Sequence, residues 1–148
     1  MINFRMKQAA TALALACVLG AAHAQSPAAP DGSLFRDLGG LPVIQQVVDD
    51  FMRNMLDDTR IRHTFKDSNI KRVKDKLVEQ FCQLSGGGCV YTGDPMREVH
   101  QGLKLSNADF NALVEDLQLA MDKNGIPSRT QNRLLALLAP MQRETVSR

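Results

Sequence analysis

The amino-acid sequence predicts an all-α fold. In residues 25–148, apolar side chains recur at intervals of three and four, the period of an amphipathic helix. Glycine pairs, a glycine run and capping residues separate these stretches. No segment of useful length alternates with the period of two that indicates a strand, and the same region contains no internal repeat and no low-complexity tract.

Residues 1–24 have the form of a secretory signal peptide. A basic start with Arg5 and Lys7 precedes an apolar run of small residues and leucine, and Ala22–Ala24 (AHA) has the A-x-A form of a signal-peptidase site. The run is shorter than the roughly 20 residues that span a bilayer, which argues against a transmembrane anchor. A lipoprotein signal at Cys17 is a weaker alternative, because alanine rather than leucine stands three residues before it. We therefore expect a periplasmic or secreted protein with no stable membrane insertion after the leader is removed.

The chain that remains after Ala24 is enough for one domain with a single core. Two of the 18 basic residues and none of the 16 acidic residues lie in the leader, so the formal charge of residues 25–148 is zero. This balance gives no support for a nucleic-acid-binding surface, and we expect no nucleic-acid partner. His23 also belongs to the leader, which leaves only His63 and His100 in the mature chain.

The first half of the mature chain predicts a polar linker and three helices. The linker covers residues 25–32, and a very short helix at 33–38 ends at two glycines. The next helix, at 41–56, carries one apolar stripe: Ile44, Val47, Val48, Phe51, Met52 and Met55. A turn then reaches Phe65, and Ser68 is the expected N-cap of the third helix. The stripe of this helix consists of Ile70, Val73, Leu77, Phe81 and Leu84, and residues 85–88 (SGGG) end it.

The second half predicts a short helix and two longer ones. Asp94 and Pro95 suit the N-cap and first position of a short helix in which His100 shares the stripe of Met96, Val99 and Leu103. Residues 106 and 109 (Ser and Asp) resemble a capping box for a long helix that ends at residues 124–125 (Asn-Gly). The last helix begins at residues 127–128 (Pro-Ser), and its expected inward residues are Leu134, Leu135, Leu137, Leu138 and Met141.

Cys82 and Cys89 are the two cysteines of the mature chain. Because an exported protein meets an oxidising compartment and the intervening residues QLSGGG are flexible, a disulfide is slightly favoured over two separate thiols. Such a short loop would be stabilised by about 2.5 kcal/mol in the chain-entropy model. The sequence contains no CxxCH motif, so covalent attachment of a c-type haem is not expected.

His100 on an apolar stripe has two interpretations. It is either a core or half-buried histidine that hydrogen-bonds a backbone carbonyl, or an iron ligand, since a neutral imidazole on an apolar wall suits haem iron. One histidine is too few for a zinc site made by protein alone, which needs three or four ligands. A porphyrin supplies four nitrogens, so a single histidine is sufficient for haem.

Several short motifs resemble the truncated haemoglobins, most closely those of group I. They occur in family order from about Leu34 to about Met141: FRDLGG, DFMRNMLDD, the lone Phe65, YTG, MREVHQG and NGIP. The resemblance implies a globin-like, two-over-two α-helical sandwich, a truncated globin domain at 33–148, that holds one haem b (iron protoporphyrin IX).

The same resemblance implies roles for individual side chains. His100 would be the proximal ligand, Phe65 would pack against the porphyrin face, and Tyr91 would lie near the haem edge. Phe51 and Met52 from the second helix, with Val73 and Leu77 from the third, would line the distal side. Lys76 would reach a haem propionate or, as a neutral amine, bind the iron itself. Alternatively the apolar residues are ordinary core, Lys76 is a solvated charge and Tyr91 anchors a loop.

Three positions depart from the family pattern. Members of the group usually have tyrosine where Met52 stands, and often glutamine at Val73 or Leu77, and these groups hydrogen-bond bound dioxygen. Losing one such bond of roughly 1.5–3 kcal/mol would speed dioxygen dissociation about 10- to 100-fold. We therefore expect weak, fast-exchanging dioxygen and easier autoxidation, while nitric oxide and carbon monoxide depend less on such a donor.

The leading functional hypothesis is an exported haem protein that binds diatomic gases and depends on an unidentified electron donor to keep its iron ferrous. A haem enzyme acting on nitric oxide, nitrite or peroxide is the alternative, although no distal histidine is evident to help cleave an O–O bond. A haem-free helical interaction domain and a haem transporter are two further alternatives. Catalytic activity is left open.

Overall fold

A computed structural model describes residues 30–147, and all of its regular elements are helical. The predicted signal peptide and most of the predicted linker lie outside the described residues. The elements are α1 (Ser33–Asp37), α2 (Gly40–Asp57), the 3₁₀ helix η1 (Arg62–Phe65), α3 (Ile70–Leu84), α4 (Met96–Val99), α5 (Asn107–Lys123), α6 (Ser128–Leu138), the 3₁₀ helix η2 (Ala139–Met141) and α7 (Gln142–Thr145). The predicted all-α fold is confirmed.

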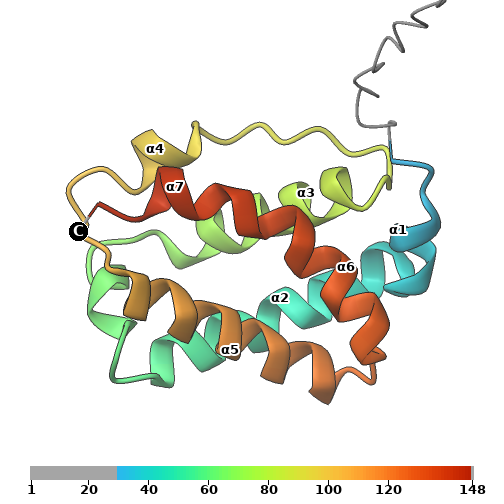
Figure 1. Ribbon diagram of the computed structural model, residues 1–148, viewed down its shortest axis with the longest axis horizontal. Coiled ribbons are helices and arrows are strands. Elements are labelled where there is room, and N and C mark those ends of the chain that lie inside the picture. The colour runs from blue at the N-terminus through green and yellow to red at the C-terminus, as the bar shows by residue number, and fades with distance from the viewer. Residues whose placement is uncertain (1–29, 148) are drawn as a thin grey trace, which may run out of the picture.

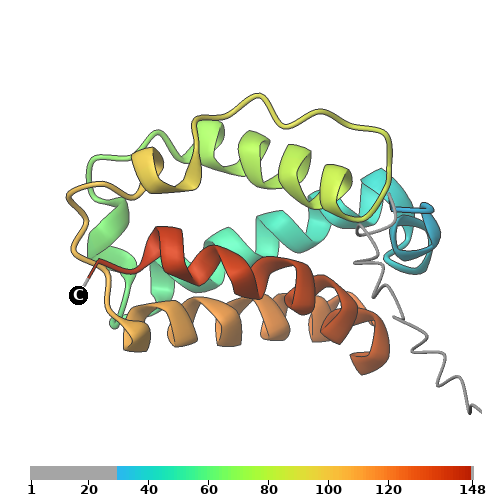
Figure 2. The same ribbon diagram turned by 45° about the horizontal axis from the view of Figure 1, so that its top comes forward.

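Two helix pairs lie across one another. Helix α2 contacts both α3 and α5, and α5 runs beside the chain of α6, η2 and α7 (Figures 1 and 2). Short α4 packs against α7 at one end of the molecule, and α1 contacts α2 and α6 at the other. The four long elements therefore form a two-over-two sandwich. No helix within residues 30–147 is both long and apolar enough to cross a bilayer.

The core lies along α2. All six residues of its predicted stripe are buried: Ile44, Val47, Val48, Phe51, Met52 and Met55. Phe51 stacks on Phe81 of α3, with ring centroids 6.4 Å apart and planes 24° from parallel. Leu117 and Met121 of α5 and Leu134 of α6 are each at most 1% exposed and close the same core from the other layer.

Helix termini follow the sequence signals with small shifts. Ser106 and Asp109 form the predicted capping box, and α5 ends at Lys123 with Asn124 as its C-cap, followed by Gly125 with φ of +69°. The cap of α3 is Asn69 rather than Ser68, because the Asn69 side chain accepts the hydrogen bond from the Arg72 amide. Both residue types cap well, so the pattern did not distinguish them.

Two other expectations require correction. The helix of His100 ends at Val99, so His100 is its C-cap, and Leu103 lies beyond it and is 38% exposed. Leu137 does not face inward but is 39% exposed. The leucines of α6 occupy more than one face of the helix, and only one face can be buried.

The predicted disulfide is present. Cys82, fully buried near the end of α3, is bonded to Cys89 in the following loop, and their Cα atoms are 5.6 Å apart. This bond fixes where the long loop between α3 and α4 begins. Because that loop forms part of the wall described below, the disulfide is structurally connected to the site.

Candidate functional site

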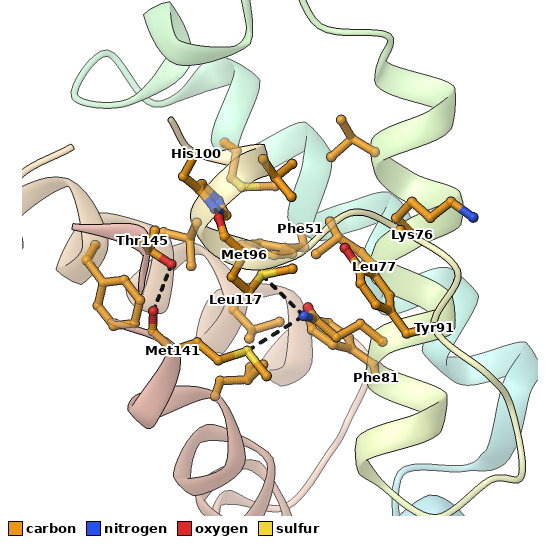
Figure 3. A pocket seen from close by; sticks show the side chains of 18 of the residues that line it. Phe51, Lys76, Leu77, Phe81, Tyr91, Met96, His100, Leu117, Met141 and Thr145 are labelled. Carbon is orange, nitrogen blue, oxygen red and sulfur yellow. Dashed lines mark hydrogen bonds between the residues drawn. The ribbon is translucent and has the colours of Figure 1, made fainter. Parts of the chain in front are cut away.

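An almost wholly apolar cavity of about 240 Å³ lies between the two layers. Residues of α3, α4, α5 and the C-terminal helices line it, together with Phe51 and Met55 of α2 (Figure 3). The amphipathic stripes explain this position, since each helix turns its apolar face inward toward the cavity. The cavity is therefore a concave site with few polar groups, the usual form of a site for a small organic molecule or cofactor.

His100 lies at the wall of this cavity, and its ring is oriented by its own helix. The Nδ1 atom is 2.7 Å from the carbonyl oxygen of Met96, one turn earlier (Figure 3). A carbonyl only accepts, so Nδ1 carries the hydrogen and donates it. In the neutral ring, Nε2 is then left with its lone pair, which is the tautomer that binds a metal.

Seven of the eight predicted site residues line this one cavity: Phe51, Phe65, Val73, Lys76, Leu77, Tyr91 and His100. They come from α2, η1, α3, the following loop and α4, so the fold brings together side chains almost 50 positions apart. Met52 is the exception, because it is buried in the core but is not part of the cavity wall. Met55, three residues later, contributes to the wall instead.

Lys76 at the rim of the cavity is already engaged in polar contacts. Its Nζ atom lies 2.8 and 2.9 Å from the two carboxylate oxygens of Glu79 and 2.6 Å from the hydroxyl oxygen of Thr92. The contact with Lys76, and after it the hydrogen bond from the Thr92 amide, lower the pKa of Glu79 to about 2, so the carboxylate stays ionised. In Figure 3 the amino end of Lys76 points away from His100 and the other labelled side chains.

The loop that carries Tyr91 is fastened to α3. The Tyr91 amide donates to the side-chain oxygen of Gln83, and its hydroxyl donates to the backbone carbonyl of Asp94. A β-carbon at Gly93 would overlap the Tyr91 ring, so the glycine of the YTG motif is required by this close approach. Burial and the nearby carboxylates of Asp94 and Glu79 raise the pKa of Tyr91, which keeps the phenol protonated.

Sequence reasoning missed several residues of the wall. Phe110, Leu113 and Leu117 of α5, with Leu138 and Met141 near the C-terminus, line the cavity as members of stripes that were assigned only to the core. Gln80 was missed for another reason. It lies between apolar positions of the α3 stripe and was assigned no role from the sequence, yet it is buried and lines the cavity.

A two-over-two helical sandwich around an apolar cavity with one metal-competent histidine defines the truncated form of the globin class. The chain belongs to the bacterial-like globin family, whose model matches residues 33–147. It is 34% identical over 116 residues, 78% of this chain and 85% of the relative, to the group 1 truncated haemoglobin GlbN of Mycolicibacterium paratuberculosis. It is 31% identical over 94 residues to the group 1 truncated haemoglobin of Tetrahymena thermophila, covering 64% of this chain and 78% of that one.

Solved structures agree on the fold. The truncated haemoglobin of Tetrahymena pyriformis in its Fe(III) form superimposes with a TM-score of 0.75 at 24% identity, covering 78% of this chain and 98% of that one. The 2/2 haemoglobin of Synechococcus sp. PCC 7002, solved with covalently attached haem, gives 0.72 at 21% identity, with the same coverage. The chain is thus a truncated globin, a member of a class of haem proteins that bind diatomic gases.

Proposed function

We propose that this chain is an exported gas-binding globin that holds haem b through His100. The observation that carries the proposal is the contact of Nδ1 of His100 with the Met96 carbonyl, which leaves Nε2 available to an iron atom. The porphyrin would supply four nitrogen ligands, so the protein need add only this one.

The other residues of the cavity also fit a bound haem. Phe65 and Tyr91 offer flat aromatic faces, and the apolar side chains of α5 and α6 accept the porphyrin body. Arg72 and Lys76, both at the cavity wall, are cations within the region where propionate carboxylates would reach solvent. Arg72 at present pairs with Asp94 at 3.4 Å, a long and exposed contact that is easily exchanged for another carboxylate.

The gas would bind on the side of α2 and α3. The apolar part of the lining there includes Phe51, Met55, Val73 and Leu77, and none of these four side chains offers a hydrogen-bond donor to a bound gas. This composition supports fast exchange of dioxygen. Binding of carbon monoxide and nitric oxide would be affected less, because these gases depend less on a hydrogen-bond donor. A physiological reductant of unidentified kind would return the iron to the ferrous state.

Two features support export to the periplasm or cell exterior. The leader in residues 1–24 has the pattern of a signal peptide. The disulfide between Cys82 and Cys89 is a bond that persists in oxidising compartments and is rare in the cytosol.

Replacing His100 with glycine tests the proposal directly. The His100→Gly variant, expressed with its leader and supplied with haemin, should lose the Soret band of the wild type. Free imidazole at millimolar concentration should restore the band by occupying the vacated ligand position. A matched control is His63→Gly, because His63 is exposed and does not line the cavity. A wild-type protein that stays colourless with haemin, or a His100→Gly variant with an unchanged spectrum, would refute the assignment.

A further inference from the structure

Gln80 is a polar side chain buried among apolar ones at the cavity wall. It lies on α3 one turn after Lys76 and Leu77, and it is only 8% exposed. Its amide nitrogen lies 3.5 Å from the sulfur of Met96 and 3.6 Å from the sulfur of Met141 (Figure 3). Thioether sulfur is a weak acceptor, so these contacts replace only part of what the amide gives up on leaving water.

The rest of the polar lining is satisfied by the protein itself. Besides His100, the polar side chains of the wall each contact an oxygen or nitrogen of a neighbour: Asn69, Arg72, Lys76, Tyr91, Asp94 and Thr145. Within residues 30–147, Gln80 has only the two sulfur contacts. It is therefore the buried hydrogen-bonding group of this wall that is left without a strong partner.

A buried amide with only weak acceptors reduces the stability of the fold, so its presence at this position calls for a functional reason. Burying an amide without a good hydrogen bond costs free energy, whereas leucine or methionine of similar volume would fill the same space without that cost. Met96 and Met141 would pack readily against either replacement, since thioethers adapt to their neighbours. An amide retained at the wall of a ligand cavity is instead typical of a group that fixes the bound molecule.

We propose that Gln80 is a ligand-binding residue whose amide N–H donates a hydrogen bond to an oxygen acceptor of the haem complex. This inference rests on the proposed haem site. The acceptor is either a propionate carboxylate or an iron-bound diatomic gas, two oxygen acceptors that the experiment below separates. The contact with Met96, whose carbonyl orients His100, places this amide beside the helix that carries the iron ligand.

The first test compares Gln80→Met with the wild type in two states. In the haem-free protein, the variant should unfold at the same or a higher urea concentration, because a buried amide with only weak sulfur acceptors has been removed. In the haem-loaded protein, haem transfer to excess apomyoglobin should become about three- to tenfold faster if the acceptor is a propionate, the factor expected for one hydrogen bond. The matched control Gln46→Met, at an exposed site on α2, should change neither measurement.

The second test identifies the acceptor. If it is a propionate, the difference in transfer rate between wild type and Gln80→Met should shrink when haemin is replaced by its dimethyl ester. If it is the bound gas, Gln80→Met should shift the infrared C–O stretch of the carbon monoxide complex. A variant that changes neither measurement, or whose haem-free form is clearly less stable than the wild type, refutes the role of Gln80 while leaving the haem site intact. Failure of the wild type to take up haem refutes the proposed function, and this inference with it.

Discussion

The ammonium group of Lys76 lies within 2.9 Å of both carboxylate oxygens of Glu79, one turn further along α3. Thr92 completes the arrangement, because its hydroxyl contacts Lys76 at 2.6 Å and its amide donates to Glu79 at 2.9 Å. The lysine therefore fastens the loop after α3 to the helix. To bind iron, its amino group would have to leave these contacts with Glu79 and Thr92.

Lys76→Ala should therefore leave the ferric haem spectrum unchanged. Because the lysine is held by Glu79 and Thr92, we expect a five-coordinate or water-bound iron in both proteins, as judged by absorption and resonance Raman spectra at neutral pH. A low-spin, six-coordinate spectrum that disappears in the variant would show instead that Lys76 is an iron ligand. Lys71→Ala is a suitable control, since Lys71 is exposed on the same helix.

Breaking the disulfide should destabilise the protein without removing any helix. For the short loop between Cys82 and Cys89, the chain-entropy model gives about 2.5 kcal/mol. Urea unfolding with and without a reductant should reveal a loss of this order, and Cys89→Ser should reproduce it in the absence of reductant. Equal midpoints in oxidised and reduced wild type would contradict the prediction.

Asp116 should make stability depend on pH. It is 4% exposed on α5, one of its carboxylate oxygens has no hydrogen-bond partner within residues 30–147, and burial, aided by Asp58, raises its pKa to about 6. An acid with a raised pKa in the folded state costs stability where it must ionise. The cost is absent below the unfolded pKa near 4, grows between pH 4 and 6, and is fully present above pH 6.

Asp116→Asn removes that cost. We expect a gain of about 1–3 kcal/mol in the free energy of unfolding at pH 7–8 and little gain at pH 4, measured by urea titration at both values. Asp75→Asn is the control, because Asp75 is exposed and forms a surface ion pair with Lys71. A difference between wild type and Asp116→Asn that is the same at both pH values would show that the carboxylate does not titrate as expected.

Periodicity predicted the helices well because burial alone determines which face of a helix turns inward. All six stripe residues of α2 are buried, and His100 was identified from its place beside Met96 and Val99. Periodicity says less about which buried residue faces a cavity. Met52 and Met55 are both in the core, but only Met55 lines the wall, a distinction that depends on how α2 packs against α3 and α5.

Gln80 shows that sequence patterns also miss a polar residue that is buried. Pattern reasoning assigns a glutamine between apolar positions to solvent, since a buried amide needs a partner that local sequence does not reveal. The two sulfur atoms near Gln80 come from α4 and η2, which are 16 and 61 positions away. Only the assembled fold brings them together, so no window of the sequence contained the signal.

Introducing a hydrogen-bond donor should slow dioxygen release from the apolar side of the cavity. Leu77 is the best position, because it lines the cavity on α3, whereas Met52 is buried behind the wall. In ferrous Leu77→Gln, we expect dioxygen dissociation to slow about 10- to 100-fold and autoxidation to slow with it, since an amide can donate to the polarised adduct. Carbon monoxide, which carries less charge when bound, should be affected much less.

The control for this variant places the same amide outside the cavity. Val78→Gln adds a glutamine to α3 at the next position, whose side chain packs against the core but does not line the cavity. Both rates should be measured by stopped-flow spectroscopy after reduction. If Leu77→Gln and Val78→Gln behave alike, or if the wild type already releases dioxygen as slowly as Leu77→Gln, then the pocket holds a donor that the apolar wall does not account for, and Gln80 would be the first side chain to test.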